Sequence, residues 1–194
     1  MEVEAQIKTE STMIYYVDND IKLNKIVSSD GKTKKFFNEY GNLHGQPAIT
    51  LNGIKKYYMN GKLHRINGVA IEYPDDRPGE WFFLGLRHRE NGVAFIDRSG
   101  TEYYYFLGKL HNPNGPAITL YDGSIFYYIH GVQHRGNGKA AVILANGRVE
   151  YIVDGEFHRI DGPAYIDEMG FNRYYINGVH YLKEEFLEIT KGIK

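Results

Sequence analysis

The sequence has no cysteine among its 194 residues, which excludes disulfides, thiolate metal sites and cysteine nucleophiles and fits a reducing compartment. Basic and acidic side chains number 23 and 24, so no net field attracts nucleic acid or anionic membranes. Apolar runs are far too short to span a membrane, and the N-terminal segment is acidic and polar, unlike a signal peptide. These absences predict a cytoplasmic protein for which nucleic acid and membrane partners are disfavoured.

Catalytic motifs are missing as well. We find no glycine-rich phosphate loop before a helix and no nucleophile elbow, and the five serines stand in no recognisable setting. Carboxylates such as Glu72, Asp97 and Asp167 are scattered and do not recur, so a paired acid/base site is not supported. The sequence predicts a protein that is not an enzyme and needs no cofactor.

What the chain does have is glycine and tyrosine, at 22 and 17 residues, a composition typical of short aromatic strands joined by tight turns. These residues belong to a repeat, because histidines recur at intervals of 20 to 24 residues with a glycine two or three positions before each. The recurring histidines are His44, His64, His88, His111, His134, His158 and His180.

Most repeats contain a second turn, such as Asn52-Gly53, Asp122-Gly123 and Asn146-Gly147. Asn-Gly and Asp-Gly pairs supply the positive φ angles of a two-residue hairpin turn, so strands should enter and leave each one. We therefore predict an all-β fold, an elongated antiparallel meander of β-hairpin repeats of about 23 residues, closed by a short C-terminal helix.

The two ends depart from the repeat. Near the C-terminus, Leu182, Phe186, Ile189 and Ile193 follow helical spacing, and such a helix would cover the last open strand edge. The expected segments are an N-terminal tail (1–14), a degenerate capping repeat (15–41), the repeat array (42–180) and a capping helix (181–194).

Strand neighbours point to opposite faces, so position relative to the turn glycine sorts the aromatic residues into two columns. We expect the first column to face the packed side, beside a column of alanines. The first column comprises Tyr57, Trp81, Tyr104, Tyr127, Tyr151 and Tyr174, and the alanines are Ala48, Ala70, Ala94, Ala117, Ala140 and Ala164. The second column has polar companions and is a candidate partner-binding surface, or it simply covers a two-sided sheet. Its aromatic members are Tyr58, Phe82, Tyr105, Tyr128 and Tyr175.

Arginine follows the histidine in four repeats, which predicts an interrupted basic row along one edge. The row can capture carboxylate or phosphate groups, or it can be a solvated edge that discourages aggregation. These arginines are Arg65, Arg89, Arg135 and Arg159.

The histidines themselves are predicted to be structural. Equivalent positions in neighbouring repeats lie about 10 Å apart, too far to share a zinc ion, so we expect no metal site. We expect each imidazole instead to hydrogen-bond turn backbone that no strand partner reaches. The histidines assigned this role are His64, His88, His111, His134 and His158.

The motif HRIDGPA at His158 to Ala164, with HRINGVA at His64 to Ala70, resembles a variant branch of the MORN repeat family. That branch is similar to repeat proteins of large DNA viruses and phages and to antitoxin-like bacterial proteins. The resemblance implies a hairpin-repeat fold and protein–protein interaction, as in a viral or phage effector or antitoxin-like factor acting in the cytoplasm of a host.

The leading hypothesis is thus a non-catalytic protein that binds, and can inhibit, another protein through an extended repeat surface. One alternative is a protein that sequesters a nucleotide or another small anionic ligand, with arginines holding phosphate and rings stacking on bases. The other is a membrane-associated scaffold, which the balanced charge disfavours.

Overall fold

A computed structural model describes residues 24–27, 34–37, 48–49 and 53–193. The predicted tail at 1–14 and His44 lie outside the described residues, as does most of the predicted capping repeat at 15–41. The chain divides into two compact units, Met1–Arg89 and Glu90–Lys194, and each is described by itself.

The first unit contains a five-stranded antiparallel sheet with strand order β1-β2-β3-β4-β7 and two separate hairpins, β5–β6 and β8–β9. The strand bounds are β1 (Asn24–Val27), β2 (Lys34–Phe37), β3 (Ala48–Ile49), β4 (Lys55–Lys56), β5 (Tyr58–Met59), β6 (Lys62–Leu63), β7 (Ile71–Glu72), β8 (Phe82–Phe83) and β9 (Leu86–Arg87).

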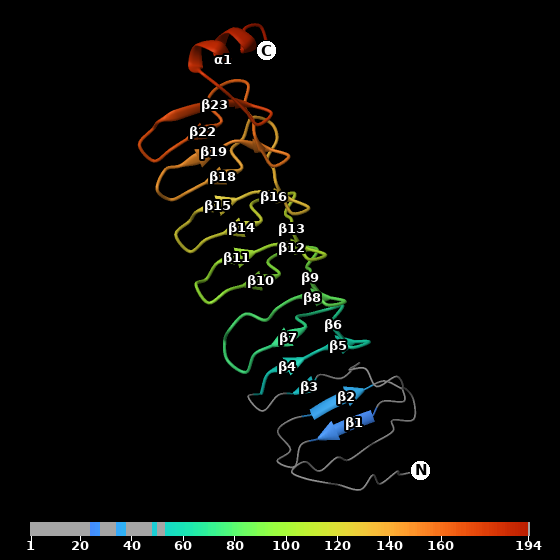
Figure 1. The fold of residues 1–194 in the computed structure, drawn as a ribbon. Coiled ribbons are helices and arrows are strands. Elements are labelled where there is room, and N and C mark those ends of the chain that lie inside the picture. Colours follow the sequence, from blue (N-terminus) through green and yellow to red (C-terminus); the bar gives the residue numbers. More distant parts are fainter. Residues whose placement is uncertain (1–23, 28–33, 38–47, 50–52, 194) are drawn as a thin grey trace. The chain divides into compact units, whose positions relative to one another are not determined.

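The second unit contains a nine-stranded sheet with order β10-β11-β14-β15-β18-β19-β22-β23-β24 and three separate hairpins, β12–β13, β16–β17 and β20–β21. Its elements are β10 (Phe95–Ile96), β11 (Glu102–Tyr103), β12 (Tyr105–Phe106), β13 (Lys109–Leu110), β14 (Ile118–Thr119), β15 (Ile125–Phe126), β16 (Tyr128–Ile129), β17 (Val132–Gln133), β18 (Val142–Ile143), β19 (Val149–Glu150), β20 (Ile152–Val153), β21 (Glu156–Phe157), β22 (Tyr165–Ile166), β23 (Asn172–Ile176), β24 (Val179–Tyr181) and α1 (Lys183–Thr190). The predicted all-β meander of hairpins with one short C-terminal helix is confirmed (Figure 1).

The strands of the repeats are interrupted. In the repeat that begins at β11, the strand is interrupted at Tyr104, whose N–H donates to the Ala117 carbonyl at 2.8 Å. Before the break the chain belongs to the sheet, and after it the chain forms the β12–β13 hairpin. Figure 1 shows the result for the second unit, with sheet strands such as β14 and β15 along one side and hairpins along the other.

The hairpin tips are tight two-residue turns in which both central residues have positive φ. Leu107 and Gly108, for example, have φ angles of 46° and 79°. This combination defines a type I′ turn, whose twist matches that of the flanking strands. The residues that precede the tip glycines with positive φ are Asn60, Leu84, Leu107, His130, Asp154 and Asn177.

The second turns differ from the two-residue turns that the sequence predicts. At Asp122-Gly123 the glycine has a φ of 87°, whereas Asp122 is not left-handed. The Asp122 carboxylate instead accepts the Ser124 N–H at 2.8 Å, and the Gly123 N–H donates to the Leu120 carbonyl at 3.0 Å. For Asp122-Gly123 and Asn146-Gly147 the prediction of positive φ at both residues is therefore wrong, because the Asp122 or Asn146 side chain accepts a backbone N–H two residues later and stabilises a wider loop. Asn52 lies outside the described residues.

Successive hairpin tips stack on each other within each unit. The N–H of Gly131 donates to the Leu110 carbonyl of the preceding hairpin at 2.8 Å, and Gly155 donates to Gln133 at 2.9 Å. A Cβ on Gly155 would lie 3.4 Å from the Val132 side chain, so even an alanine at this tip would touch the preceding hairpin. Glycine thus serves both the turn conformation and the stacking of tips.

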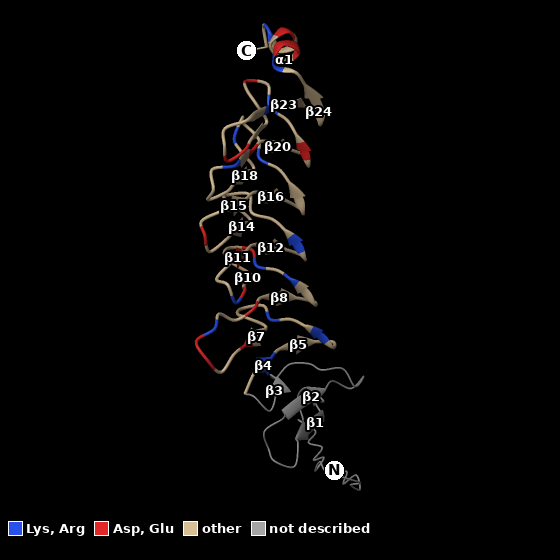
Figure 2. Ribbon diagram, turned by 60° about the vertical axis from the view of Figure 1, so that its left-hand side comes forward, with Lys and Arg blue, Asp and Glu red and all other residues tan. Residues whose placement is uncertain are grey.

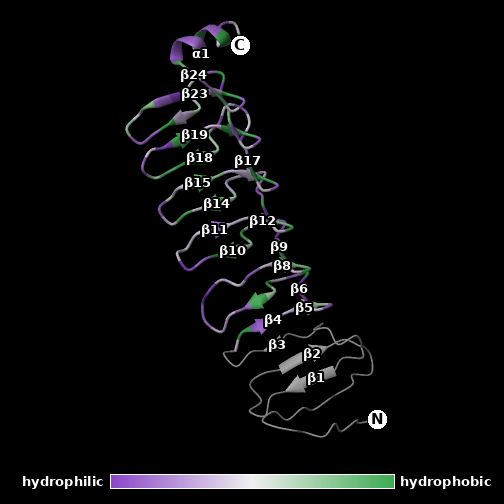
Figure 3. Cartoon of the chain, viewed as in Figure 1, coloured by the Kyte–Doolittle hydropathy of each residue, from purple (hydrophilic) through white to green (hydrophobic). Residues whose placement is uncertain are grey.

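The buried core is thin and repeats with the chain, as the apolar segments in Figure 3 do within the second unit. Fully buried alanines recur at Ala94, Ala117, Ala141 and Ala164. The prediction that Ala140 belongs to this column is wrong by one residue. The Tyr127 N–H donates to the carbonyl of Ala141, as the Tyr104 N–H donates to that of Ala117, so Ala141 occupies the position. The loop after His134 has one more residue than the loop after His111, and Asn137 takes a φ of 61° there.

The C-terminal helix α1 is confirmed, but it covers less than expected. Phe186 is 2% exposed and packs on Tyr174 with ring centroids 4.8 Å apart. Leu182, Ile189 and Ile193 are instead 62%, 48% and 53% exposed, so the expectation that they help to cover the sheet end is wrong. Within the described ranges, no helix combines the length and apolarity that crossing a bilayer requires.

Candidate functional site

The arginines that follow the histidines lie over the rings of the first aromatic column. Each guanidinium carbon is close enough to a ring centroid for a cation–π contact. The distances are 3.8 Å for Arg65 over Tyr57, 4.2 Å for Arg89 over Trp81, 3.7 Å for Arg135 over Tyr127 and 3.9 Å for Arg159 over Tyr151. We call these residues the arginine face of their respective units.

A backbone carbonyl further along the same loop holds the arginine in place. Arg135 Nη1 donates to the Ala140 carbonyl at 2.9 Å, and Arg159 Nη1 donates to the Pro163 carbonyl at 3.3 Å. A Cβ on Gly162 would lie 3.1 Å from Arg159 Cζ, so the loop glycine makes room for the guanidinium. The HRxxGxA pattern is thus a unit in which arginine, glycine and ring fit together.

Four of the recurring histidines, His64, His111, His134 and His158, link one repeat to the next. His111 Nδ1 accepts the His130 N–H at 3.1 Å, and His158 Nδ1 accepts the Asn177 N–H at 3.2 Å. His64 and His134 accept in the same way from Leu84 and Asp154, each at 3.2 Å. The donors are the left-handed residues of the following tips, so the predicted hydrogen bond to turn backbone is present but crosses between repeats.

These bonds require a neutral imidazole, because a protonated Nδ1 is a donor and cannot accept an N–H. Burial lowers the pKa of His64. Burial, and after it the charge of His130, lowers the pKa of His111, whose ring stacks on His130 with centroids 4.2 Å apart. The remaining predicted histidine, His88, packs its ring edge-on against Phe83.

The aromatic side chains of the second column are half-buried, and so are those of the first column. Ile152, its member in the β20 hairpin, is 4% exposed and forms a buried cluster with Ala141 and Val142. Burial raises the pKa of Tyr58 and Tyr128. The expected contrast between a packed first column and a partly exposed second column is therefore not found.

The other predicted members of this column also contact neighbouring rings or arginines. Tyr105 stacks on Tyr103, and Tyr175 packs against Phe157 at 5.1 Å. Phe82 has the guanidinium of Arg87 5.8 Å from its ring centroid. These side chains serve partly as contacts between strands.

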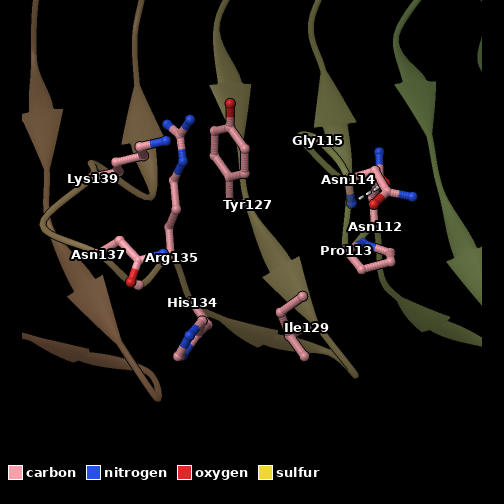
Figure 4. A pocket seen from close by; sticks show the side chains of 11 residues that line it. Asn112, Pro113, Asn114, Gly115, Tyr127, Ile129, His134, Arg135, Asn137 and Lys139 are labelled. Atoms are coloured by element: carbon pink, nitrogen blue, oxygen red, sulfur yellow. Dashed lines mark hydrogen bonds between the residues drawn. The ribbon is translucent and has the colours of Figure 1, made fainter.

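The arginine face is interrupted at Asn112, which takes the place of an arginine. Asn112 Nδ2 donates to the Pro116 carbonyl at 2.8 Å and so replaces the arginine's loop contact with a shorter side chain. Beside it a groove of about 540 Å³ opens in the second unit. Figure 4 shows Tyr127 and Ile129 on its central strand, with Arg135 and Lys139 on one side and Asn112 and Pro113 on the other.

Sequence reasoning named Arg135 and His134 but missed Lys139 and Asn137 as their companions in the groove. The signal was the interruption of the arginine row at Asn112, which was visible in the sequence but has no meaning until the loops are placed side by side. Within residues 53–193 and the short strands before them, no three His, Asp or Glu side chains gather as a metal site would require.

No protein-family model matches the chain, and no curated protein or solved structure is significantly similar to it.

Proposed function

We propose that the chain is a non-catalytic binding protein whose arginine face contacts another protein. The observation that carries this proposal is the repeated stacking of arginine on Tyr or Trp in one register. Tyr, Trp and Arg dominate the binding energy of protein interfaces. A guanidinium already held by a ring and a carbonyl loses little conformational entropy when a partner binds.

The face remains accessible to a partner although its side chains are held. The side chains of Arg65 and Arg159 are 33% and 19% exposed. Charged residues of both signs are interspersed along the second unit in Figure 2. Such mixing does not favour an anionic membrane or nucleic acid. The resemblance to the MORN variant branch points in the same direction, toward a partner protein such as the target of an effector or antitoxin.

Site-specific photo-cross-linking in the source organism tests this proposal. A photoreactive residue at Asn114, beside the groove on the arginine face, should yield a specific adduct with one protein. The matched control is Tyr121, which is 86% exposed at a second turn. Equal adducts from both positions, or none from Asn114, would contradict the proposed surface.

The captured partner is then titrated against the double variant Arg135→Lys, Arg159→Lys. Lysine keeps the charge but loses the planar fork and its stacking, so we expect binding to weaken roughly tenfold or more. Circular dichroism and melting show whether the variant is folded. Unchanged affinity in a folded double variant would remove the arginine face as the binding surface.

A further inference from the structure

The groove beside Asn112 differs in charge from the surroundings of Arg65 and Arg159. Arg65 pairs with Glu72, and Arg159 Nε donates to Asp161 at 2.6 Å. Arg135, in contrast, has no carboxylate within ion-pair distance among the described residues, and its polar contact is with the Ala140 carbonyl. The position that corresponds to Asp161 is occupied by Asn137, a neutral residue.

The groove contains further donors but no carboxylate. Lys139 is exposed at its rim, and the residues that line it include Asn112, Asn114 and Asn137 but neither Asp nor Glu. Of the two nearby acids, Asp161 pairs with Arg159, and Asp154 is not among the residues that line the groove. Two permanent positive charges therefore face the groove without compensation from its own walls.

The guanidinium of Arg135 is held but keeps donors to spare. The Ala140 carbonyl takes one of its five N–H groups, and stacking on Tyr127 takes none. In Figure 4 the ends of the Arg135 and Lys139 side chains lie toward the same end of the groove as the Tyr127 hydroxyl. Ile129 and Pro113 lie toward the opposite end and are apolar.

From these features we propose that the groove binds a small organic phosphate monoester. The phosphate lies against Arg135 and Lys139, and the body of the ligand lies over Ile129 and Pro113. A dianionic phosphate neutralises both cations, whereas a carboxylate neutralises one. The volume is within the range of roughly 300–1,000 Å³ that small-molecule pockets occupy. This site goes beyond the proposed protein-binding role and does not depend on it.

Isothermal titration calorimetry of the full chain with phenyl phosphate tests the site. We expect saturable binding at a 1:1 ratio. Benzoate, which has one negative charge, and phenol, which has none, should bind more weakly. Adenosine 5′-monophosphate and a phosphoserine peptide, titrated in parallel, distinguish a free nucleotide from a modified protein segment as the natural source of the phosphate. Tighter binding by either one assigns the source and supports the site.

The deciding variant is Lys139→Glu, which places a carboxylate beside Arg135. Phenyl phosphate should bind roughly tenfold more weakly to it, since a charged hydrogen bond is lost and a repulsion is added. Lys109→Glu is the matched control, because it changes the net charge equally at an exposed hairpin tip outside the groove. Equal weakening by both variants would show a general charge effect and overturn the proposal.

Two further outcomes also overturn it. One is the absence of saturable binding by any of the phosphate probes. The other is benzoate affinity equal to that of phenyl phosphate, which would remove the requirement for a dianion. Amide chemical shifts recorded during the titration should change at Asn112 and Asn137, and changes confined to other regions would place the ligand elsewhere.

Discussion

Replacing His111 with alanine should destabilise the second unit in a way that depends on pH. The substitution removes the acceptor of the His130 N–H, worth about 1 kcal/mol. It also removes ring contacts with His130 at 4.2 Å and Phe106 at 5.7 Å, together worth about 1 kcal/mol more. A loss of about 2 kcal/mol lowers the Tm of a chain of this size by roughly 4–8 °C.

The pH dependence follows from the lowered pKa of His111 in the folded chain. Below about pH 6.5, the ordinary pKa of histidine, the unfolded chain takes up a proton at this position more readily than the folded chain. The stability that neutral His111 contributes is therefore fully present above that pH and is lost as the pH falls. The difference in Tm between the wild type and His111→Ala should shrink accordingly.

Thermal melts followed by circular dichroism at pH 7.5 and pH 5.0 measure both effects. We expect the larger difference in Tm between wild type and variant at pH 7.5. An unchanged Tm at pH 7.5 would refute the structural role of His111. A difference of the same size at both pH values would refute the requirement for a neutral acceptor.

Two other predictions concern backbone conformation. Leu107→Asn should raise the free energy of unfolding by about 1 kcal/mol in urea titrations, because asparagine tolerates the positive φ of this position better than leucine does. Asn177→Leu, at the equivalent position of another tip, should lower the free energy of unfolding by a similar amount. Gly162→Ala should lower the free energy of unfolding by about 1 kcal/mol, since the new Cβ would press on the Arg159 guanidinium. Gly136→Ala should change it by less than about 0.5 kcal/mol, because the new Cβ would lie 3.7 Å from its nearest neighbour, His134 Nε2. Equal effects of the two glycine substitutions, or a loss on Leu107→Asn, would contradict these assignments.

Much of the fold was predictable because the determining interactions are short in sequence. A hairpin tip needs positive φ at two adjacent residues, and the recurring glycine marks the second of them in each repeat that the structure describes, as at Gly108 and Gly155. The short C-terminal helix was predictable for a similar reason, since the spacing of Phe186 from its apolar neighbours differs from the strand pattern.

The candidate site was predictable in part. The arginine row was visible in the sequence, but its position over the first aromatic column was not. Alternation along a continuous strand would place the arginines and the rings by face alone. The strand instead breaks at residues such as Tyr104, and the loop turns the arginine back over the ring, as for Arg135 and Tyr127. The error at Ala140 has the same origin, because one extra loop residue shifts the register, and the longer interval from Gly131 to Gly155 does not show where in the repeat that residue lies.

The sequence by itself determined where the hairpins lie, that they repeat and that their turns carry glycine, because these features depend on the φ angles of neighbouring residues. The tertiary structure decided that the histidines join consecutive repeats, that arginines cover tyrosines and that a groove opens beside Asn112. The histidine links and the groove depend on contacts between residues about 20 positions apart, such as His111 with His130, which form only once the hairpins have stacked. The arginine contacts, such as Arg135 with Tyr127, are shorter in sequence but depend on the loop that turns the arginine back over the ring.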